Sequence, residues 1–293
     1  MSETAVTPPQ VDVGFVFALA RESAGLVDLL PEPTVTVAAG LKYHHADWKG
    51  LSVVIVECGA GQDKATAATL ALIQSFRPRL IISAGFAGGL VESLERNRVV
   101  IPRTLMHEAS SETMNLAVCQ LEAPNAPGFT GNDSEDFAGD PVCKQVLPPR
   151  VPLAGLDRFA TGTLLTVDRV VNRKDEKKSL GEKHGASLVD METWSVATVC
   201  RDKDIPFLSV RVIIDPVNEE LPVEVRYISK ASDSMAELAG ALFGAMVRRP
   251  SAIMDAYRLK ENALVATDSL GKALTKILND IAREKSSQAD QTK

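Results

Sequence analysis

The stretch VDMETWSVATVCRDKDIPFLSVRVIID, residues 189–215, decides the fold because a helical pattern and a strand pattern follow one another within it. Residues 192–203 fit a helix, and residues 207–214 form an apolar run, rich in Val and Ile, that fits a buried strand. Arg211 alone interrupts the last part of this run. A helix that leads into a buried strand indicates an α/β fold.

Elsewhere in the chain, apolar runs bounded mostly by Gly, Pro or charge predict further strands. These runs cover residues 11–19, 51–57, 80–84, 97–101 and 160–166. A helical pattern over residues 64–76 lies between two of the runs, so that strands and helices alternate. We therefore expect an α/β fold, a three-layer sandwich around a mixed, largely parallel sheet.

The 293 residues predict a single domain over residues 11–283, with residues 245–280 as a helical C-terminal cap. The polar ends, residues 1–10 and 284–293, are expected to be flexible. The apolar side chains of the cap, which we expect to pack on the body of the protein, are Met254, Tyr257, Leu264 and Val265. A hydrophobic substrate tail or a membrane surface would use the same face.

Two carboxylates mark the ends of the elements in the opening stretch, Glu192 at the start of the helix and Asp215 at the end of the strand. Open α/β sheets bind ligands at the carboxyl ends of their strands, where an apolar site would raise the pKa of Asp215 toward that of a general acid. With Glu192 as an acceptor for sugar hydroxyls, the pair suggests a nucleoside site. Alternatively, Glu192 is favoured by the helix dipole and Asp215 caps the strand before Pro216.

Four segments follow one another along the chain: FALARE at 17–22, CGAG at 58–61, SAGFAGG at 83–89, and the carboxylate segments quoted above. In this order they resemble the nucleoside phosphorylase and nucleosidase family of the purine and uridine phosphorylase type. Within the family the chain resembles the methylthioadenosine/S-adenosylhomocysteine nucleosidases. The resemblance implies a nucleoside phosphorylase-like fold and cleavage of the N-glycosidic bond of a purine nucleoside.

The resemblance also implies roles for the matching positions. Glu22 would orient the attacking water, Glu192 would hold the ribose hydroxyls, and Asp215 would protonate the purine at N7. Met191 would pack on the ribose face. Arg211 would orient the catalytic Asp, although a buried arginine paired with any nearby carboxylate is the plainer interpretation.

The glycine-rich turn brings the main chain close to the sugar through Ala87 and Gly88, where no side chain is needed. The chain departs from the family pattern at three positions. Phe86 replaces a small hydroxyl residue, Ile214 replaces the serine that usually precedes the catalytic Asp, and Val170 stands where an adenine-stacking phenylalanine is expected. The resemblance therefore leaves the base undetermined.

The nucleophile is water or phosphate. Ser83 stands where phosphorylases of the related hexameric class carry an arginine, which favours hydrolysis by water. Arg21, however, falls near another phosphate-binding arginine of that class and is a candidate for phosphate contact. On balance the residues favour hydrolysis.

The C-terminal part resembles a hopanoid-associated phosphorylase subgroup. The resemblance rests on DPVN at 215–218, Leu221-Pro222, and VRRP at 247–250 followed by a closing helix. Its implied substrate is an adenosine joined at C5' to a hydrophobic polycycle, such as adenosylhopane. An arginine-rich helix end followed by a proline is also ordinary helix termination.

Composition argues against several other classes of protein. The net charge of -6 and the lack of a long basic run disfavour nucleic acid, and no apolar stretch approaches the roughly 20 residues that span a bilayer. The cysteines are widely spaced and lack a CxxC pair, which indicates free thiols of a cytoplasmic protein. They are Cys58, Cys119, Cys143 and Cys200. The four histidines show no ligand spacing, so we expect neither a metal nor another cofactor.

Three functions are consistent with these residues. The first is a nucleosidase that hydrolyses a 5'-substituted adenosine and releases adenine. The second is a phosphorylase that acts on a larger, lipid-linked adenosine. The third is a nucleoside-binding sensor, which would need Glu192 but neither Glu22 nor Asp215. A small-molecule nucleoside is the expected partner, and the resemblance implies a homodimer or higher homo-oligomer.

Overall fold

The computed structural model describes residues 8–116, 159–220 and 251–291 of the chain. Four parallel strands form the centre of the sheet, in the order β4, β1, β5 and β11. Their bounds are β1 Val13–Phe17, β4 Leu51–Glu57, β5 Leu80–Gly89 and β11 Phe207–Asp215. Nearly every residue of these strands is buried, as continuous Val- and Ile-rich strands covered on both faces must be.

The sheet continues on both sides with mostly shorter strands. Antiparallel β2 (Thr34–Ala38) and β3 (Leu41–Trp48) extend it beyond β4. Beyond β5 lie β10 (Leu188–Asp190), β9 (Thr163–Thr166), β7 (Thr104–His107) and β8 (Thr113–Asn115), and β6 (Val99–Val100) pairs with β11. A sheet with a parallel centre and antiparallel pairs around it confirms the expected mixed α/β architecture.

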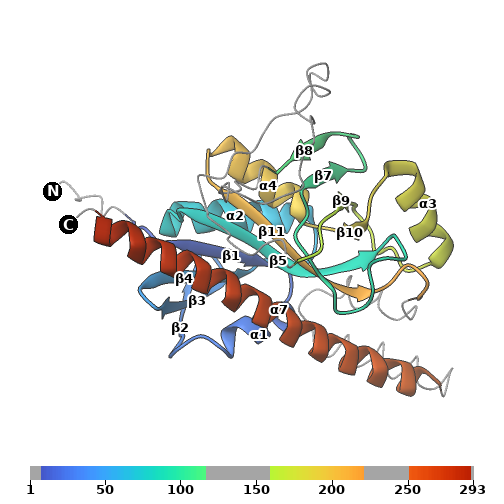
Figure 1. Ribbon diagram of the computed structural model, residues 1–293, viewed down its shortest axis with the longest axis horizontal. Coiled ribbons are helices and arrows are strands. Elements are labelled where there is room, and N and C mark those ends of the chain that lie inside the picture. Colours follow the sequence, from blue (N-terminus) through green and yellow to red (C-terminus); the bar gives the residue numbers. More distant parts are fainter. Residues whose placement is uncertain (1–7, 117–158, 221–250, 292–293) are drawn as a thin grey trace, which may run out of the picture.

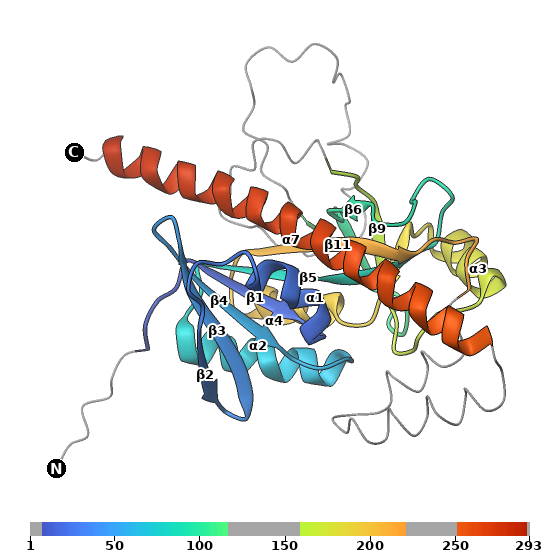
Figure 2. The same ribbon diagram turned by 90° about the horizontal axis from the view of Figure 1, so that it is seen from below.

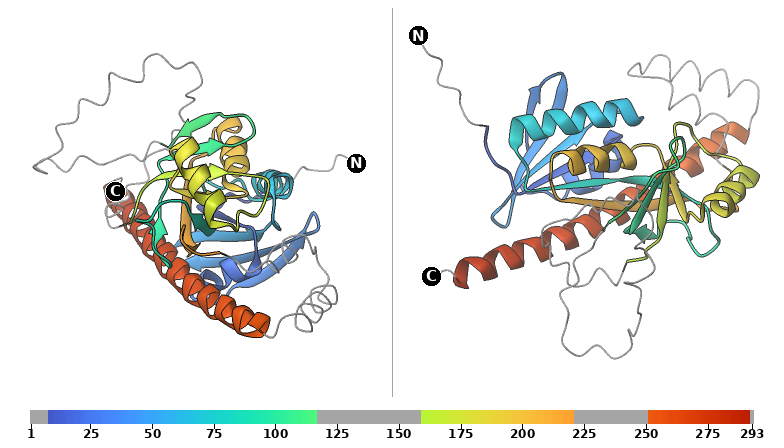
Figure 3. Two further views of the ribbon diagram at one scale, coloured as in Figure 1. Left: turned by 90° about the vertical axis from the view of Figure 1, so that its right-hand side faces the viewer. Right: turned by 90° about the horizontal axis from the view of Figure 1, so that it is seen from above.

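Helices cover both faces of the sheet (Figures 1 and 2). Helices α2 (Gln62–Phe76) and α4 (Thr193–Asp202) pack on one face, and α1 (Ala20–Val27) and α7 (Ser251–Gln291) pack on the other. Helix α3 (Lys174–His184) lies beside the smaller strands. In Figure 3, right, the cyan α2 and the red α7 lie on opposite sides of the sheet, which gives the three expected layers.

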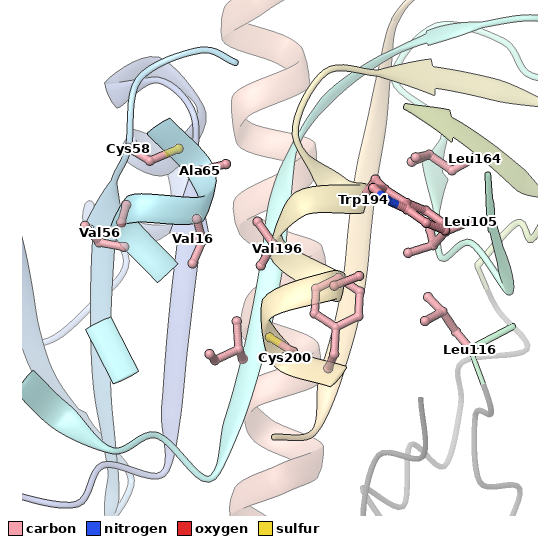
Figure 4. Packing of buried hydrophobic residues seen from close by; sticks show 14 of the residues in the cluster. Val16, Val56, Cys58, Ala65, Leu105, Leu116, Leu164, Trp194, Val196 and Cys200 are labelled. Carbon is pink, nitrogen blue, oxygen red and sulfur yellow. The ribbon is translucent and has the colours of Figure 1, made fainter. Parts of the chain in front are cut away.

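Two apolar cores separate these layers. In one core, Trp194, Val196 and Cys200 of α4 and Ala65 of α2 pack on the strands (Figure 4). In the other, the buried side of α7 packs on β5, β6 and β11 through Leu270, among others. Each core removes one face of the sheet from water, which is the main favourable contribution to folding.

Helix α7 differs from its prediction in two ways. It continues to Gln291, past the predicted end of the cap at residue 280, and Lys285 Nζ lies 2.8 Å from Asp12 Oδ2. Leu264 and Val265, expected to pack, are 60% and 50% exposed. Other residues of the helix face the protein interior instead. This buried stripe runs through Ala263, Ala266, Leu270, Leu274 and Ile277. The side chains of Met254 and Tyr257 lie outside the described residues.

Other differences concern the bounds of the predicted strands and several elements that were not predicted. The runs at 11–19 and 97–101 contain shorter strands, Val13–Phe17 and Val99–Val100, whereas the run at 80–84 extends to Gly89. Helices α1 and α3 and the edge strands were not predicted, because exposed polar residues obscure their periodicity. Within the described ranges, no helix combines the length and the apolar character needed to cross a membrane.

Helices α1 and α7 cross at two glycines. A Cβ atom on Gly271 would lie 2.3 Å from the carbonyl oxygen of Gly25, and one on Gly25 would lie 2.2 Å from that of Thr267. Neither backbone can yield locally, because both atoms belong to hydrogen-bonded helices. The absence of side chains here lets α7 lie directly on α1.

Adding one methyl group at this crossing tests its importance. Gly271→Ala should destabilise the protein by about 1–3 kcal/mol, since overpacking outweighs the roughly 1 kcal/mol that alanine gains over glycine in a helix. Thermal unfolding should show a melting temperature lowered by several degrees, whereas the exposed control Lys276→Ala should leave it nearly unchanged. A Gly271→Ala protein as stable as the parent would contradict this packing.

Candidate active site

Glu22 is fixed by main-chain N–H groups. It lies in the first turn of α1, where its Oε2 accepts hydrogen bonds from Ala18 N at 3.1 Å and Leu19 N at 2.9 Å. Its Oε1 accepts another from Phe86 N, in β5, at 2.8 Å. The carboxylate therefore joins the end of β1 to β5. Gly85 leaves it room, because a Cβ there would lie 2.9 Å from Oε1.

Glu192 occupies the N-cap position of α4, where its carbonyl accepts hydrogen bonds from Ser195 N and Val196 N. Its side chain does not cap the helix but accepts a hydrogen bond from Gly61 N at 2.7 Å. The alternative prediction, that Glu192 serves the start of a helix, therefore holds for its main chain and not for its side chain. The carboxylate itself is directed across to the loop before α2.

A pocket joins these two carboxylates. Its lining comes from β1, β5, α1, α4, the loop after β4, and β11. The lining residues are Val16, Ala18, Glu22, Cys58, Ser83, Ala84, Gly85, Phe86, Glu192, Val196 and Arg211. Three of the lining residues, Val16 on β1, Cys58 after β4 and Val196 on α4, are labelled in Figure 4. The pocket thus lies at the carboxyl ends of β1 and β4 and beside α4.

The charge of Arg211 is neutralised inside the protein. Its Nη2 lies 3.0 Å from Asp190 Oδ2 and donates hydrogen bonds to Ser83 Oγ and Thr193 Oγ1 at 2.7 Å and 2.5 Å. The expected contact with Asp215 is absent, and Asp190 is the carboxylate that Arg211 pairs with. Arg211 is thus a buried arginine paired with a nearby carboxylate, as the plainer interpretation expected. It also lines the pocket.

Asp215 ends β11 opposite Gly88, and a β-bulge between Ile213 and Asp215 sets its position. It is 3% exposed and does not line the pocket that holds Glu22 and Glu192. Its Oδ2 lies 2.6 Å from the Nζ atom of Lys177, a fully buried lysine of α3. Burial raises the pKa of Asp215 to about 6, while Lys177 and Arg96 oppose the rise.

Burial also alters the acids of the pocket. It raises the pKa of Glu22 although three main-chain N–H groups and Arg211 favour the ionised form. Burial, together with the charges of Asp190 and Glu22, raises the pKa of Glu192 strongly. Burial and the two glutamates raise the pKa of the Cys58 thiol to about 12, which rules it out as a thiolate nucleophile at neutral pH.

The remaining predicted residues lie at different distances from the pocket. Phe86 lines it, and Ala87 and Gly88 continue β5 from the pocket toward Asp215. Met191 precedes Glu192 and is partly buried. Val170 follows β9 and Arg21 is exposed on α1, and neither belongs to the pocket lining.

The sequence interpretation missed three residues whose polar groups hold the site together: Gly61 through its main-chain N–H, and Asp190 and Lys177 through their side chains. Gly61 and Asp190 lie inside segments that were recognised, but their contacts connect elements far apart in the chain. Lys177 stands among charged residues, and only Leu180, three positions later, indicates that it faces inward. Among the described residues, no group of three or more His, Cys, Asp or Glu is arranged to hold a metal ion.

A family model described as Phosphorylase superfamily matches residues 12–248 of the chain. Among curated proteins, the 5'-methylthioadenosine/S-adenosylhomocysteine nucleosidase of Shewanella pealeana is 27% identical over 78% of this chain and 97% of its own length. The protein of the same name from Listeria monocytogenes serotype 4a is 26% identical over 72% of this chain and 89% of its own length.

Solved structures share the fold. A futalosine hydrolase of Helicobacter pylori strain 26695 superposes with a TM-score of 0.60 at 18% identity, over 92% of this chain and 98% of that chain. The Helicobacter pylori 5'-methylthioadenosine/S-adenosylhomocysteine nucleosidase, in complex with a pyrrolidine ligand, gives a TM-score of 0.61 at 18% identity, over 93% and 99% of the two chains.

The buried ion pair of Asp190 with Arg211 should be essential for stability. Asp190→Asn would leave a buried guanidinium without its counter-charge, which costs about 3–5 kcal/mol. Asp168→Asn provides the same chemical change at a side chain that is 82% exposed, where a loss of at most about 1 kcal/mol is expected. Melting temperatures measured by circular dichroism should separate the two variants. Equal values would show that the pair contributes little.

Proposed function

This chain belongs to the phosphorylase superfamily, and we propose that it is a nucleosidase that hydrolyses the N-glycosidic bond of a 5'-substituted adenosine. The names of the curated relatives support methylthioadenosine and S-adenosylhomocysteine as the substrate class. The observation that carries the proposal is the pocket in which Glu22 and Glu192 meet beside β5, the strand whose Gly88 pairs with Asp215. The expected homodimer and cytoplasmic location remain predictions.

In this proposal the two pocket carboxylates serve the sugar. Glu192, anchored by Gly61 N, accepts hydrogen bonds from the ribose hydroxyls. Glu22, held by three N–H groups, orients the attacking water and takes its proton. A sugar that becomes cationic as the bond breaks is stabilised by nearby negative charge, so both groups favour the transition state over the ground state.

Asp215 serves the leaving base. Its protonated carboxyl gives a proton to the purine N7 as the bonding electrons of the N-glycosidic bond move to the base. Water adds its oxygen to the sugar C1', and its proton passes to Glu22, so that free base and free sugar are the products. A general acid works best when its pKa lies near the working pH, and burial of Asp215 supports this.

Charge in the pocket supports water as the nucleophile. Phosphate is an anion, and the pocket presents Glu22 and Glu192 together with an arginine whose charge is already paired with Asp190. Arg21, the candidate phosphate contact, does not line the pocket. A phosphate ion would therefore find no unpaired cation among the lining residues to hold it.

Replacing the proposed acid should abolish most turnover. Asp215→Asn should lower kcat by at least about 100-fold while changing KM little, because an amide cannot deliver the proton. Since the protonated form is the active one, kcat of the parent should fall as pH rises above about 6. Asp202→Asn, at an exposed carboxylate, is the matched control. Turnover of Asp215→Asn within a few-fold of the parent would rule out this role.

The products identify the nucleophile. Incubated with methylthioadenosine in excess phosphate, the enzyme should release adenine and the free sugar, at a rate that phosphate does not increase. The physical reason is that the lining residues offer no unpaired cation to bind a phosphate ion. Sugar analysis by mass spectrometry distinguishes the outcomes. A phosphate-dependent release of sugar 1-phosphate would establish a phosphorylase and return Arg21 to consideration.

A further inference from the structure

Lys177 is unusual because lysine is almost never fully buried unless it is paired. Its side chain has an exposed fraction of 0%, although Lys174, Lys178 and Lys183 of the same helix are all exposed. Helix α3 turns Lys177, Leu180 and Gly181 toward the protein, so the lysine occupies a position where an apolar residue is usual. Such a costly placement indicates a specific partner.

That partner is the segment that ends β11. Lys177 Nζ donates hydrogen bonds to the carbonyl oxygens of Asp215 at 3.3 Å, Pro216 at 3.0 Å and Glu219 at 2.8 Å. It also lies 2.6 Å from Asp215 Oδ2, an oxygen that has no other polar partner among the described residues. One ammonium group thus holds both the main chain and the carboxyl group of the proposed acid.

Two cations, Lys177 and Arg96, act on Asp215. Helix α3 contributes Lys177, and the connection between β5 and β6 contributes Arg96, which donates to Ile214 O and pairs with the carboxylate of Glu219. Strand β5 faces Asp215 with Gly88, which carries no charge. Glu219 is neutralised by Arg96, so Lys177 is the group that directly opposes the negative charge of Asp215.

We propose that Lys177 is a positioning residue that holds Oδ2 of Asp215 and leaves Oδ1 as the oxygen that gives its proton to the leaving base. This inference rests on the proposed acid role of Asp215. When Oδ1 releases its proton, the new carboxylate already has an ammonium at Oδ2, so no rearrangement is needed at the moment of reaction.

The same contact sets the pH range of the reaction. Burial raises the pKa of Asp215 to about 6, and the Lys177 ammonium holds it from rising further. An opposite charge at this distance commonly lowers the pKa of a carboxyl group by about one to three units. Without Lys177, the acid should stay protonated at higher pH, but it should be a weaker donor and less well oriented.

The test is the pH profile of kcat in Lys177→Met and Lys177→Gln, with Lys178→Met as the exposed control on the same helix. Methionine fills similar space without charge. Glutamine also removes the charge but can still donate to the carbonyl oxygens, and it therefore serves where methionine prevents folding. In both variants the alkaline limb should move up by about one pH unit or more. Maximal kcat should fall by about 10-fold or more, with a smaller change in KM.

The outcomes separate the two proposals. A folded Lys177 variant whose alkaline limb stays at the parental pH overturns the positioning role, even when kcat falls. If Asp215→Asn keeps parental turnover, both the acid and its positioning residue are wrong. Both proposals are supported if Asp215→Asn loses turnover and the alkaline limb of the kcat profile moves to higher pH in the Lys177 variants but not in Lys178→Met. Lys178→Met should match the parent in limb and kcat.

Discussion

The parallel pairing of β5 with β11 is the constraint on which the rest of the site depends. Its register aligns Ser209 with Ser83, Arg211 with Gly85 and, after the bulge, Asp215 with Gly88. One ladder of main-chain hydrogen bonds therefore places Arg211 in the pocket lining and Asp215 at the end of β11. A slip of one residue would turn each of these side chains to the opposite face.

Buried charge is the main cost of this arrangement, and it is offset by close pairing. Arg211 has Asp190, Lys177 has Asp215, and Glu22 has three main-chain N–H groups. Glycine makes the close approach possible, because Gly85 leaves space for Glu22 where a Cβ would collide with its carboxylate. The acids thus stay inside the protein, where exclusion of water strengthens their interactions and raises their pKa values.

Patterns with a local physical cause were predictable. Apolar runs revealed β1, β4, β5 and β11, since strands buried on both faces consist of Val, Ile and Leu. The edge strand β2 was missed because its exposed residues carry no burial signal. Helix α7 was expected, but its inward stripe was misplaced, because the helix turns Ala263, Ala266 and Leu270 toward the protein and leaves Leu264 and Val265 exposed.

The sequence by itself determined the α/β class and the family resemblance, and it singled out Glu22, Glu192 and Asp215 as candidate acids, because each belongs to a short segment whose residues are neighbours in the chain. Only the tertiary structure decided which charges meet. Asp190 rather than Asp215 pairs with Arg211, and Lys177, from a helix 38 residues before Asp215, supplies the cation beside it. The physical reason is that an ion pair depends on distance in space, which chain packing sets and local pattern does not record.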